Sequence, residues 1–317
     1  MEYLILILSL AGIVLGADFL VKGAVVVARK CRVSSFVIGA VIVGIGTSLP
    51  ELVVSTVGAI GGNSEVAIGN VVGSNIFNVF AILGLTALFF PIAVSRENMK
   101  FEIPFCIAVS VLLMLLVYNF FVGGEPRLGR WDGAALLLVF TSFMWISLRR
   151  GKSSAATVGE SVEEENKSLW FAAFSILGGL AALIVSSNFF VDEAVAIARK
   201  LGVSDAFISI TLLACGTSLP ELAASVTAAV KKDTDMALGN IIGSNIFNAT
   251  MILGTASLIT PLTTGKIGLV DYGAMILAAV LPMIFGIRGK ITRIEGLLML
   301  LCYAAYTWYI VTYVMAV

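Results

Sequence analysis

Histidine is absent from this chain of 317 residues, and only 13% of its residues are charged. Without imidazole groups, a histidine proton relay, a histidine metal site and the usual catalytic triads are excluded. The four cysteines are scattered and have the spacing of neither a metal site nor a disulfide framework. Lys and Arg together equal Asp and Glu in number, so no basic surface indicates a nucleic-acid partner.

Apolar sequence, by contrast, is abundant. Hydrophobic residues make up 59% of the chain, which leaves too few charges to cover a soluble domain of this size. We therefore predict an all-α membrane protein with ten transmembrane helices in a lipid bilayer. The predicted spans lie near residues 3–28, 36–60, 66–93, 101–121, 132–148, 169–197, 206–230, 235–260, 269–287 and 293–315. Glu2 stands where a signal peptide carries positive charge, which favours a first span over a cleaved signal.

An internal repeat divides the chain. Shifting the sequence by 170 positions aligns residues 18–84 with 188–254 without a gap, and roughly 31 of the 67 pairs are identical. We predict a first five-helix repeat at 1–150, a linker at 151–168 and a second five-helix repeat at 169–317. Because each half has an odd number of spans, the repeats have inverted topology.

The distribution of Lys and Arg predicts the orientation. With both termini outside, inner loops hold about fourteen basic residues and outer loops about five, in agreement with the positive-inside rule. The linker at 151–168 is then cytoplasmic. It lacks the alternating Asp, Asn and Gly spacing of a calcium loop, so a flexible connector is favoured over a regulatory ion sensor.

Two motifs occur once in each half. Gly-Thr-Ser-Leu-Pro-Glu is found at 46–51 and 216–221, and Gly-Asn-x-x-Gly-Ser-Asn-Ile-Phe-Asn follows at 69–78 and 239–248. A carboxylate inside an apolar span is energetically expensive and indicates a functional site. Glutamates at matching positions of two repeats predict a transport site near the middle of the membrane.

The first motif suits a hard cation. In helical geometry Thr47 and Ser48 share a face with Glu51, and the same spacing occurs in Thr217, Ser218 and Glu221. Each motif also contains a proline, which cannot donate to the carbonyl four residues earlier and so breaks or kinks the helix. Backbone oxygens, hydroxyls and a carboxylate then face one cavity, and these are ligands that hard cations prefer.

The second motif adds oxygens from another span. Ser74 and Asn78 are four residues apart, as are Ser244 and Asn248, and we predict that all four are ligands.

Other residues of that motif have different predicted roles. Its glycines form a small-xxx-small pattern at 69 and 73 and again at 239 and 243, which predicts close helix packing. Asn75 and Asn245 fall on a different part of the helix from the predicted ligands. Their predicted role is either an interhelical hydrogen bond or contact with the cation.

The plainer alternatives for Glu51 and Glu221 fit less well. The spans 36–60 and 206–230 contain no Lys or Arg to form a buried ion pair, and Lys22 has a nearer partner in Asp18. Two inert protonated acids would not need such oxygen-rich surroundings. Carboxylates without a protein countercharge call for a divalent cation or several monovalent ones. Two further acids, at positions 192 and 193, are read as hydrated at the outer interface rather than as an ion entrance.

These paired motifs, in two halves of five spans, resemble the sodium/calcium exchanger branch of the calcium:cation antiporter superfamily. The resemblance implies ten helices, with the second, third, seventh and eighth enclosing the ions and the first and sixth sliding across them. It implies Glu51 and Glu221 as central ligands of Ca²⁺ and Na⁺. The other implied ligands are oxygens of Thr47, Thr217, Ser48, Ser218, Ser74, Ser244, Asn78 and Asn248 and the carbonyl of Ala214.

The chain departs from the family pattern at two places. Family members often have Asp at one of the positions of Asn78 and Asn248, and potassium-dependent members use Asp there. Asparagine at both lowers the charge of the site and argues against potassium co-transport. Gly44 replaces an Ala found in some members, and we expect little effect because the implied ligand is a carbonyl.

The sequence thus predicts a secondary active antiporter, without a cofactor or enzymatic activity, that exchanges Na⁺ for Ca²⁺ by alternating access. Both ions use the oxygens around Glu51 and Glu221, so they compete. The alternatives are a Ca²⁺/H⁺ antiporter using the same glutamates and a cation channel that needs no counter-ion. No protein partner is implied, which is compatible with a monomer, and short loops favour a multi-pass protein of a prokaryotic plasma membrane.

Overall fold

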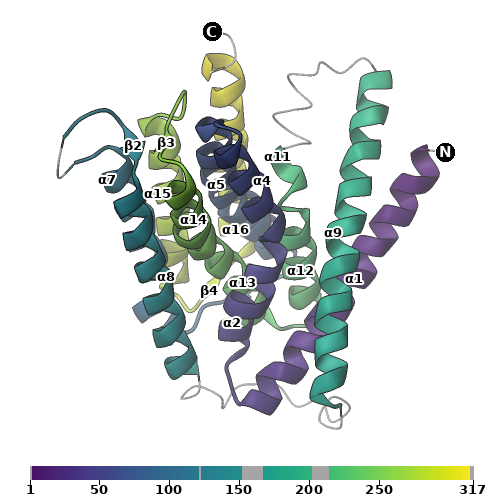
Figure 1. Ribbon diagram of the computed structural model, residues 1–317. Coiled ribbons are helices and arrows are strands. Elements are labelled where there is room, and N and C mark those ends of the chain that lie inside the picture. Colours follow the sequence, from purple (N-terminus) through teal and green to yellow (C-terminus); the bar gives the residue numbers. More distant parts are fainter. Residues whose placement is uncertain (1, 121–122, 152–166, 202–213, 315–317) are drawn as a thin grey trace.

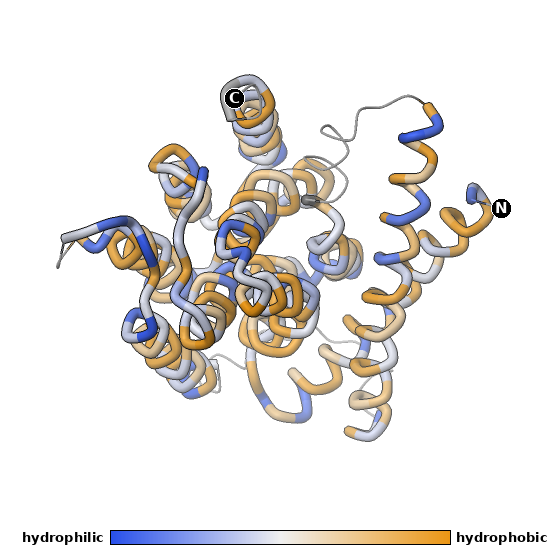
Figure 2. The backbone as a smooth tube through the Cα atoms, turned by 45° about the horizontal axis from the view of Figure 1, so that its top comes forward, coloured by the Kyte–Doolittle hydropathy of each residue, from blue (hydrophilic) through white to orange (hydrophobic). Residues whose placement is uncertain are grey.

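The computed structural model describes residues 2–120, 123–151, 167–201 and 214–314, and nearly all of them are helical. Eight helices in these ranges are long and apolar enough to cross a membrane. A bent pair, Ser35–Thr47 with Leu49–Ile60, gives a ninth if it is counted as one span. The helices run between two ends of the molecule, with hydrophobic residues along their lengths (Figures 1 and 2). This is the architecture of a multi-pass membrane protein.

The first half consists of helices with short π-helical turns, labelled η, between some of them. Its elements are α1 (Glu2–Cys31), α2 (Ser35–Ile38), η1 (Gly39–Val43), α3 (Gly44–Thr47), α4 (Leu49–Ile60), α5 (Ser64–Phe77), η2 (Asn78–Leu83), α6 (Gly84–Phe89), β1 (Ile92–Ala93), η3 (Asn98–Glu102), α7 (Ile103–Val117), β2 (Arg127–Leu128) and α8 (Arg130–Gly151).

The second half repeats much of this order. Its described elements are α9 (Leu169–Lys200), α11 (Ala214–Gly216), α12 (Leu219–Val230), α13 (Thr234–Phe247), η7 (Asn248–Ile252), α14 (Leu253–Ile259), β3 (Leu262–Thr263), α15 (Leu269–Gly286), β4 (Lys290–Ile291), α16 (Arg293–Tyr309) and η8 (Ile310–Val314). The predicted start of the seventh span, 206–213, lies outside the described residues, as does most of the linker at 152–166. The count of ten helices therefore stays a prediction.

Four strands of two residues each were not predicted. β1 pairs antiparallel with β4, with Ile92 opposite Ile291, and β2 pairs antiparallel with β3, with Arg127 opposite Thr263. Each pair joins a loop of one half to a loop of the other. The two halves are thus tied together outside the helical core as well as inside it.

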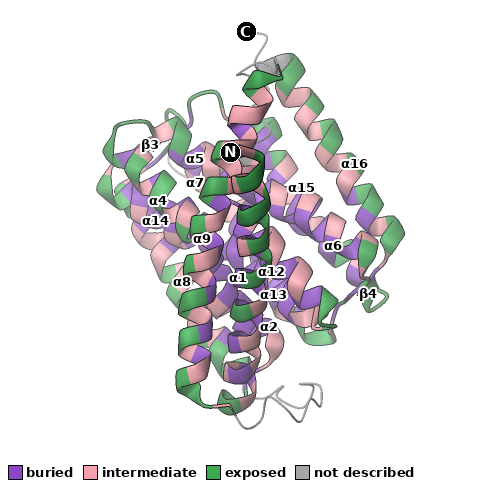
Figure 3. Cartoon of the chain, turned by 90° about the vertical axis from the view of Figure 1, so that its right-hand side faces the viewer, coloured by how far each residue is buried: buried purple, intermediate pink, exposed green. Residues whose placement is uncertain are grey.

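α5 and α13 form the centre of the molecule. Over the most apolar 18-residue stretch of each span, the buried share is 83% in Thr234–Ile259 and 72% in Ser64–Phe89, against 11% in Arg293–Thr312. Figure 3 shows the same contrast between the buried interior and the exposed outer helices. Both central helices begin at a side-chain cap, because Asn63 accepts from Val66 N and Asp233 accepts from Met236 N.

α1 and α9 lie side by side and antiparallel at one edge of the bundle (Figure 1). Their backbones meet at two glycines. A Cβ atom added at Gly16 would lie 2.9 Å from the carbonyl oxygen of Gly179, and one added at Gly179 would lie 2.7 Å from that of Gly16. Glycine allows this approach because it has no Cβ, as in other membrane helix pairs.

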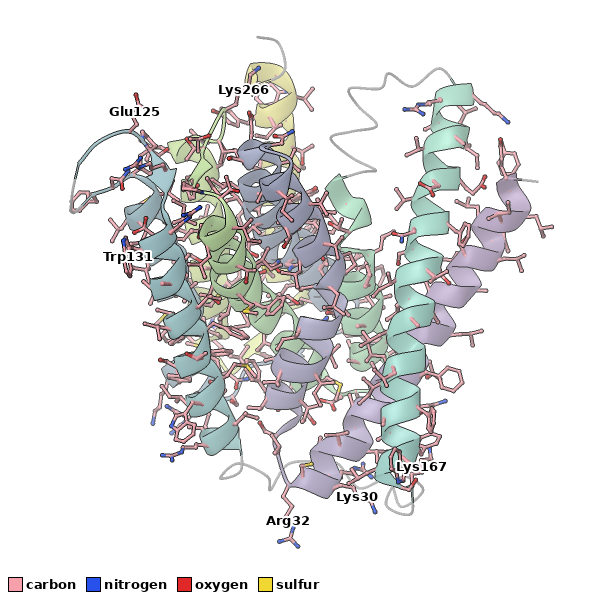
Figure 4. All side chains as sticks on the ribbon, in the orientation of Figure 1. Lys30, Arg32, Glu125, Trp131, Lys167 and Lys266 are labelled. Carbon is pink, nitrogen blue, oxygen red and sulfur yellow. The ribbon has the colours of Figure 1, made fainter. Side chains whose placement is uncertain are left out.

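The ends of the bundle differ in charge placement. Lys30, Arg32 and Lys167 lie together at one end, whereas Lys266 and Glu125 lie at the opposite end (Figure 4). The first residues of α1 and the last described residues of α16 share that opposite end (Figure 1). The arrangement agrees with termini on one side of the membrane; which end faces outward stays a prediction.

A candidate cation site

The two Gly-Thr-Ser-Leu-Pro-Glu motifs form helix breaks, as their prolines predict. α3 ends at Thr47 and α4 begins at Leu49, with a bend of 47° across the break. Ser48 between them has φ −83° and ψ 10°, and Ser218 in the other half has φ −92° and ψ 8°. Each proline sits in the first turn of the following helix, where its missing N–H would be unpaired in any case.

Both glutamates are fully buried near these breaks. Glu51 lies in the first turn of α4 and Glu221 in the first turn of α12, and each is 0% exposed. A helix N-terminus favours negative charge, which partly offsets the burial. No ion pair among the described residues includes either of them. Lys22 instead pairs with Asp18 at 2.6 Å, the partner expected from the sequence.

The serines of the two motifs cross between the halves. Ser48 Oγ donates to Glu221 Oε1 at 2.7 Å, and Ser218 Oγ donates to Glu51 Oε1 at 2.9 Å. Sequence spacing alone predicts each serine on one helical face with the glutamate of its own motif. That spacing rule holds only in a continuous helix, and the break at Ser48 and Ser218 turns the hydroxyls toward the opposite half.

Four asparagines of the second motif form a linked group. Asn75 Nδ2 donates to the backbone carbonyl of Asn245, and Asn245 Nδ2 donates to that of Asn75, both at 3.1 Å. Asn78 Nδ2 donates to Asn245 Oδ1 at 3.0 Å, and Asn248 Nδ2 donates to Asn75 Oδ1 at 3.2 Å. For Asn75 and Asn245, the interhelical hydrogen bond left open by the sequence is therefore present.

Two more asparagines were missed. Asn70 Nδ2 donates to the carbonyl of Glu51 at 3.2 Å, and Asn240 Nδ2 donates to that of Glu221 at 3.2 Å. Each also donates to a serine one turn further along the glutamate's helix, at 3.0 Å and 2.8 Å respectively. The sequence does contain an indication of their role. Both are the second residue of the repeated Gly-Asn motif, so a polar side chain occupies matching positions in two apolar spans.

Buried oxygens without partners gather around these groups. Among the described residues, one carboxylate oxygen of Glu51 and of Glu221, the amide oxygens of Asn78 and Asn248 and the Thr217 hydroxyl oxygen have no hydrogen-bond donor. The Thr217 hydroxyl nevertheless interacts with the Glu51 carboxylate, although not within hydrogen-bond geometry. Buried acceptors normally find a donor, and carboxylate, amide and hydroxyl oxygens are ligands that a hard cation could use.

The remaining predicted ligands surround this group. Ser74 Oγ lies 3.4 Å from Ser218 Oγ, whose single hydrogen is donated to Glu51, whereas Ser244 Oγ donates to the carbonyl of Gly44 at 3.2 Å. Thr47 Oγ1 donates toward Asn240 Oδ1 at 3.3 Å, so its hydroxyl bonds a neighbouring side chain.

Ala214 is the first residue of α11, directly after a segment outside the described residues. In the described part of the chain, no three His, Cys, Asp or Glu side chains cluster as metal ligands, so the two carboxylates would act with neutral oxygens.

The predicted glycine packing is present in the second half. A Cβ atom at Gly239 or Gly243 would collide with the backbone of Phe36 or Ala40. In the first half, a Cβ at Gly73 would meet nothing within 4 Å in the described part of the chain. Gly44 is also tightly placed, because a Cβ there would lie 3.0 Å from the carbonyl oxygen of Asn240.

Comparison with known proteins gives consistent matches over nearly the whole chain. The model of the sodium/calcium exchanger protein family matches residues 1–149 and 171–312. The sodium/calcium exchanger MaX1 of Methanosarcina acetivorans is 35% identical over 96% of this chain and 97% of its own length. The inner membrane protein YrbG of Escherichia coli is 34% identical over 87% of this chain and 86% of its own length. A structure of the sodium-calcium exchanger NCX_Mj soaked with 10 mM Na⁺ and no Ca²⁺ is 32% identical, with a TM-score of 0.83 and 98% of both chains covered.

Proposed function

We propose, from the premise that this chain belongs to the sodium/calcium exchanger protein family, that it exchanges Na⁺ for Ca²⁺ through a site centred on Glu51 and Glu221. Membership makes it a membrane transporter that moves Ca²⁺ against another cation. The identity of that cation and of the ligands is our proposal. It is carried by one observation, the group of buried oxygens without donors around two carboxylates that have no basic partner among the described residues.

The choice of Na⁺ over H⁺ as the coupling ion rests on the relatives, which include proteins named sodium/calcium exchangers. Asn78 Oδ1, Asn248 Oδ1 and the Thr217 hydroxyl are neutral oxygens suited to either Ca²⁺ or Na⁺. Two carboxylates match the charge of one Ca²⁺, and several Na⁺ could use the same oxygens in turn. The two loads then exclude each other, because they share ligands.

The proposed ligands come from both motifs and from Ala214. Glu51 and Glu221 supply charge, and neutral oxygens come from Thr47, Thr217, Ser48, Ser218, Ser74, Ser244, Asn78, Asn248 and the carbonyl of Ala214. A site without ions leaves two buried carboxylates uncompensated, which disfavours crossing between inward- and outward-open states. Either load relieves this charge and permits the crossing, so the two fluxes are coupled.

Alternating access through inverted repeats at 1–150 and 169–317 is part of the proposal. Support comes from the hydrogen bonds, which occur in pairs related by a shift of 170 residues. Ser48 to Glu221 matches Ser218 to Glu51, and the bonds of Asn70 match those of Asn240. We place both termini outside and the 151–168 connector in the cytoplasm.

Vesicle flux measurements test this function. Purified protein in liposomes loaded with Na⁺ should take up ⁴⁵Ca²⁺, and Glu51→Gln or Glu221→Gln should abolish the uptake. Glu102→Gln is the matched control, since Glu102 is also buried but lies in η3, and it should retain uptake.

The same assay separates the rival functions. A pH gradient without Na⁺ should drive no uptake, and a K⁺ gradient should drive none. Uptake driven by protons alone would replace the proposal with Ca²⁺/H⁺ exchange. Flux that needs no counter-ion would indicate a channel, and normal uptake by both glutamine variants would refute the assigned site.

A further inference from the structure

Asn75 and Asn245 have amide orientations that their surroundings determine. Asn75 lies in α5 and Asn245 in α13, and they are only 1% and 3% exposed. Each side chain faces the backbone carbonyl of the other residue at 3.1 Å. A carbonyl oxygen can only accept, so the atom that faces it must be the Nδ2 amide donor. The oxygen of each amide must then point the other way.

The orientation of each of these amides determines the orientation of a second asparagine side chain. Asn75 Oδ1 faces Asn248 at 3.2 Å, and Asn245 Oδ1 faces Asn78 at 3.0 Å. Because each of these oxygens is an acceptor, Asn248 and Asn78 must present their Nδ2 donors to it. Their own oxygens are left on the other side, buried and without a donor among the described residues.

We propose that Asn75 and Asn245 are positioning residues that make Asn248 and Asn78 present oxygen, and never N–H, to the transported cation. An asparagine amide has nearly the same shape in its two flipped orientations, so shape alone does not select one. A flipped Asn78 or Asn248 would point an N–H donor at the cation and repel it. The backbone carbonyls of Asn75 and Asn245 thereby determine which amide atom of Asn78 and Asn248 faces the cation.

This inference rests on the proposed function, since it takes Asn78 and Asn248 as ligands. The plainer role for Asn75 and Asn245 is to hold α5 against α13. The two roles differ in which pairs interact. The crossed bonds connect Asn75 only to Asn248, and Asn245 only to Asn78, among the ligand amides. A purely structural clamp would affect Asn78 and Asn248 alike.

Double-mutant cycles on the Ca²⁺ concentration for half-maximal uptake test the crossed pattern. Asn75→Ala and Asn245→Ala are each combined with Asn78→Ala and Asn248→Ala, with Na⁺ competition measured in parallel. We expect each single substitution of Asn75 or Asn245 to raise the half-maximal concentration about tenfold. The bonded pairs 75/248 and 245/78 should be non-additive by about threefold or more, and the unbonded pairs 75/78 and 245/248 close to additive.

The outcomes separate this inference from the proposed function. If Asn78→Ala and Asn248→Ala leave the half-maximal concentrations of both ions unchanged, the ligand assignment fails. If those two variants weaken binding but all four cycles are additive, or all are equally coupled, the positioning role is overturned. Gel filtration and thermal unfolding in detergent verify folding. Should Asn75→Ala not fold, Asn75→Ser and the independent Asn245 cycles carry the test.

Discussion

Gly243→Ala is the substitution whose effect the packing specifies most sharply. A Cβ atom at position 243 would lie 2.6 Å from the carbonyl oxygen of Ala40 and 2.7 Å from its Cβ, whereas ordinary contact begins at 3.4 Å. The obstacle includes backbone, so no side-chain rotation relieves it. α13 and η1 must instead separate by roughly 1 Å, and overpacking of this kind costs about 1–3 kcal/mol.

Gly273→Ala, in the helical interior of α15, is its matched control. Gly273 is exposed, a Cβ there meets nothing within 4 Å in the described ranges, and alanine is favoured over glycine in a helix by about 1 kcal/mol. We therefore expect Gly273→Ala to keep or raise the unfolding temperature. Gly243→Ala should lower it by about 2–4 °C per kcal/mol. Because Ser244 follows Gly243 directly, Gly243→Ala should also weaken Ca²⁺ uptake.

Thermal unfolding of both purified variants in one detergent, followed by tryptophan fluorescence, makes the measurement. Gel filtration of each variant beforehand verifies that the starting material is folded. Equal shifts for Gly273→Ala and Gly243→Ala would refute the reasoning, because the same chemical change would then be insensitive to the close approach of α13 and η1.

Two further substitutions test single contacts. Ser48→Ala removes the 2.7 Å hydrogen bond to Glu221, and bonds to charged groups contribute about 1.5–3 kcal/mol, so the Ca²⁺ concentration for half-maximal uptake should rise about 10- to 100-fold. An unchanged value would mean that the crossed bond does not orient the carboxylate. Lys231→Met breaks the 2.7 Å ion pair between Lys231 and Asp18, two side chains that are each about one-third exposed. The loss should destabilise the fold by about 1 kcal/mol or less. The difference in unfolding temperature should shrink at high salt, and a large salt-independent loss would contradict a surface ion pair.

The sequence predicts the helix breaks and the buried charges but not how the halves meet. Proline in each first motif correctly predicts the interruption at Ser48 and Ser218, since its effect on the backbone is local. The crossed bonds of these serines depend on how two breaks from distant parts of the chain dock. Spacing within one helix cannot reveal this, because it relates each serine only to the glutamate of its own motif.

The π-helical turns at the site could not be predicted from the sequence either. π-Helical turns begin at Asn78 and at Asn248, the final asparagine of each second motif. Such turns are rare and often found at functional sites, and no residue pattern in these motifs marks them. The glycine pattern was equally ambiguous, because Gly73 and Gly243 occupy matching positions, yet among the described residues another backbone comes close to Gly243 and none to Gly73.

Equilibrium binding of ⁴⁵Ca²⁺ to the purified protein in detergent tests the central assignment most directly, because it requires no flux. The wild type should bind Ca²⁺ saturably, and added Na⁺ should displace it. Glu51→Gln and Glu221→Gln should each lose this binding, whereas Glu102→Gln should keep it. Saturable Ca²⁺ binding that persists in the Glu51→Gln/Glu221→Gln double variant would contradict the assignment of these glutamates as the centre of the site.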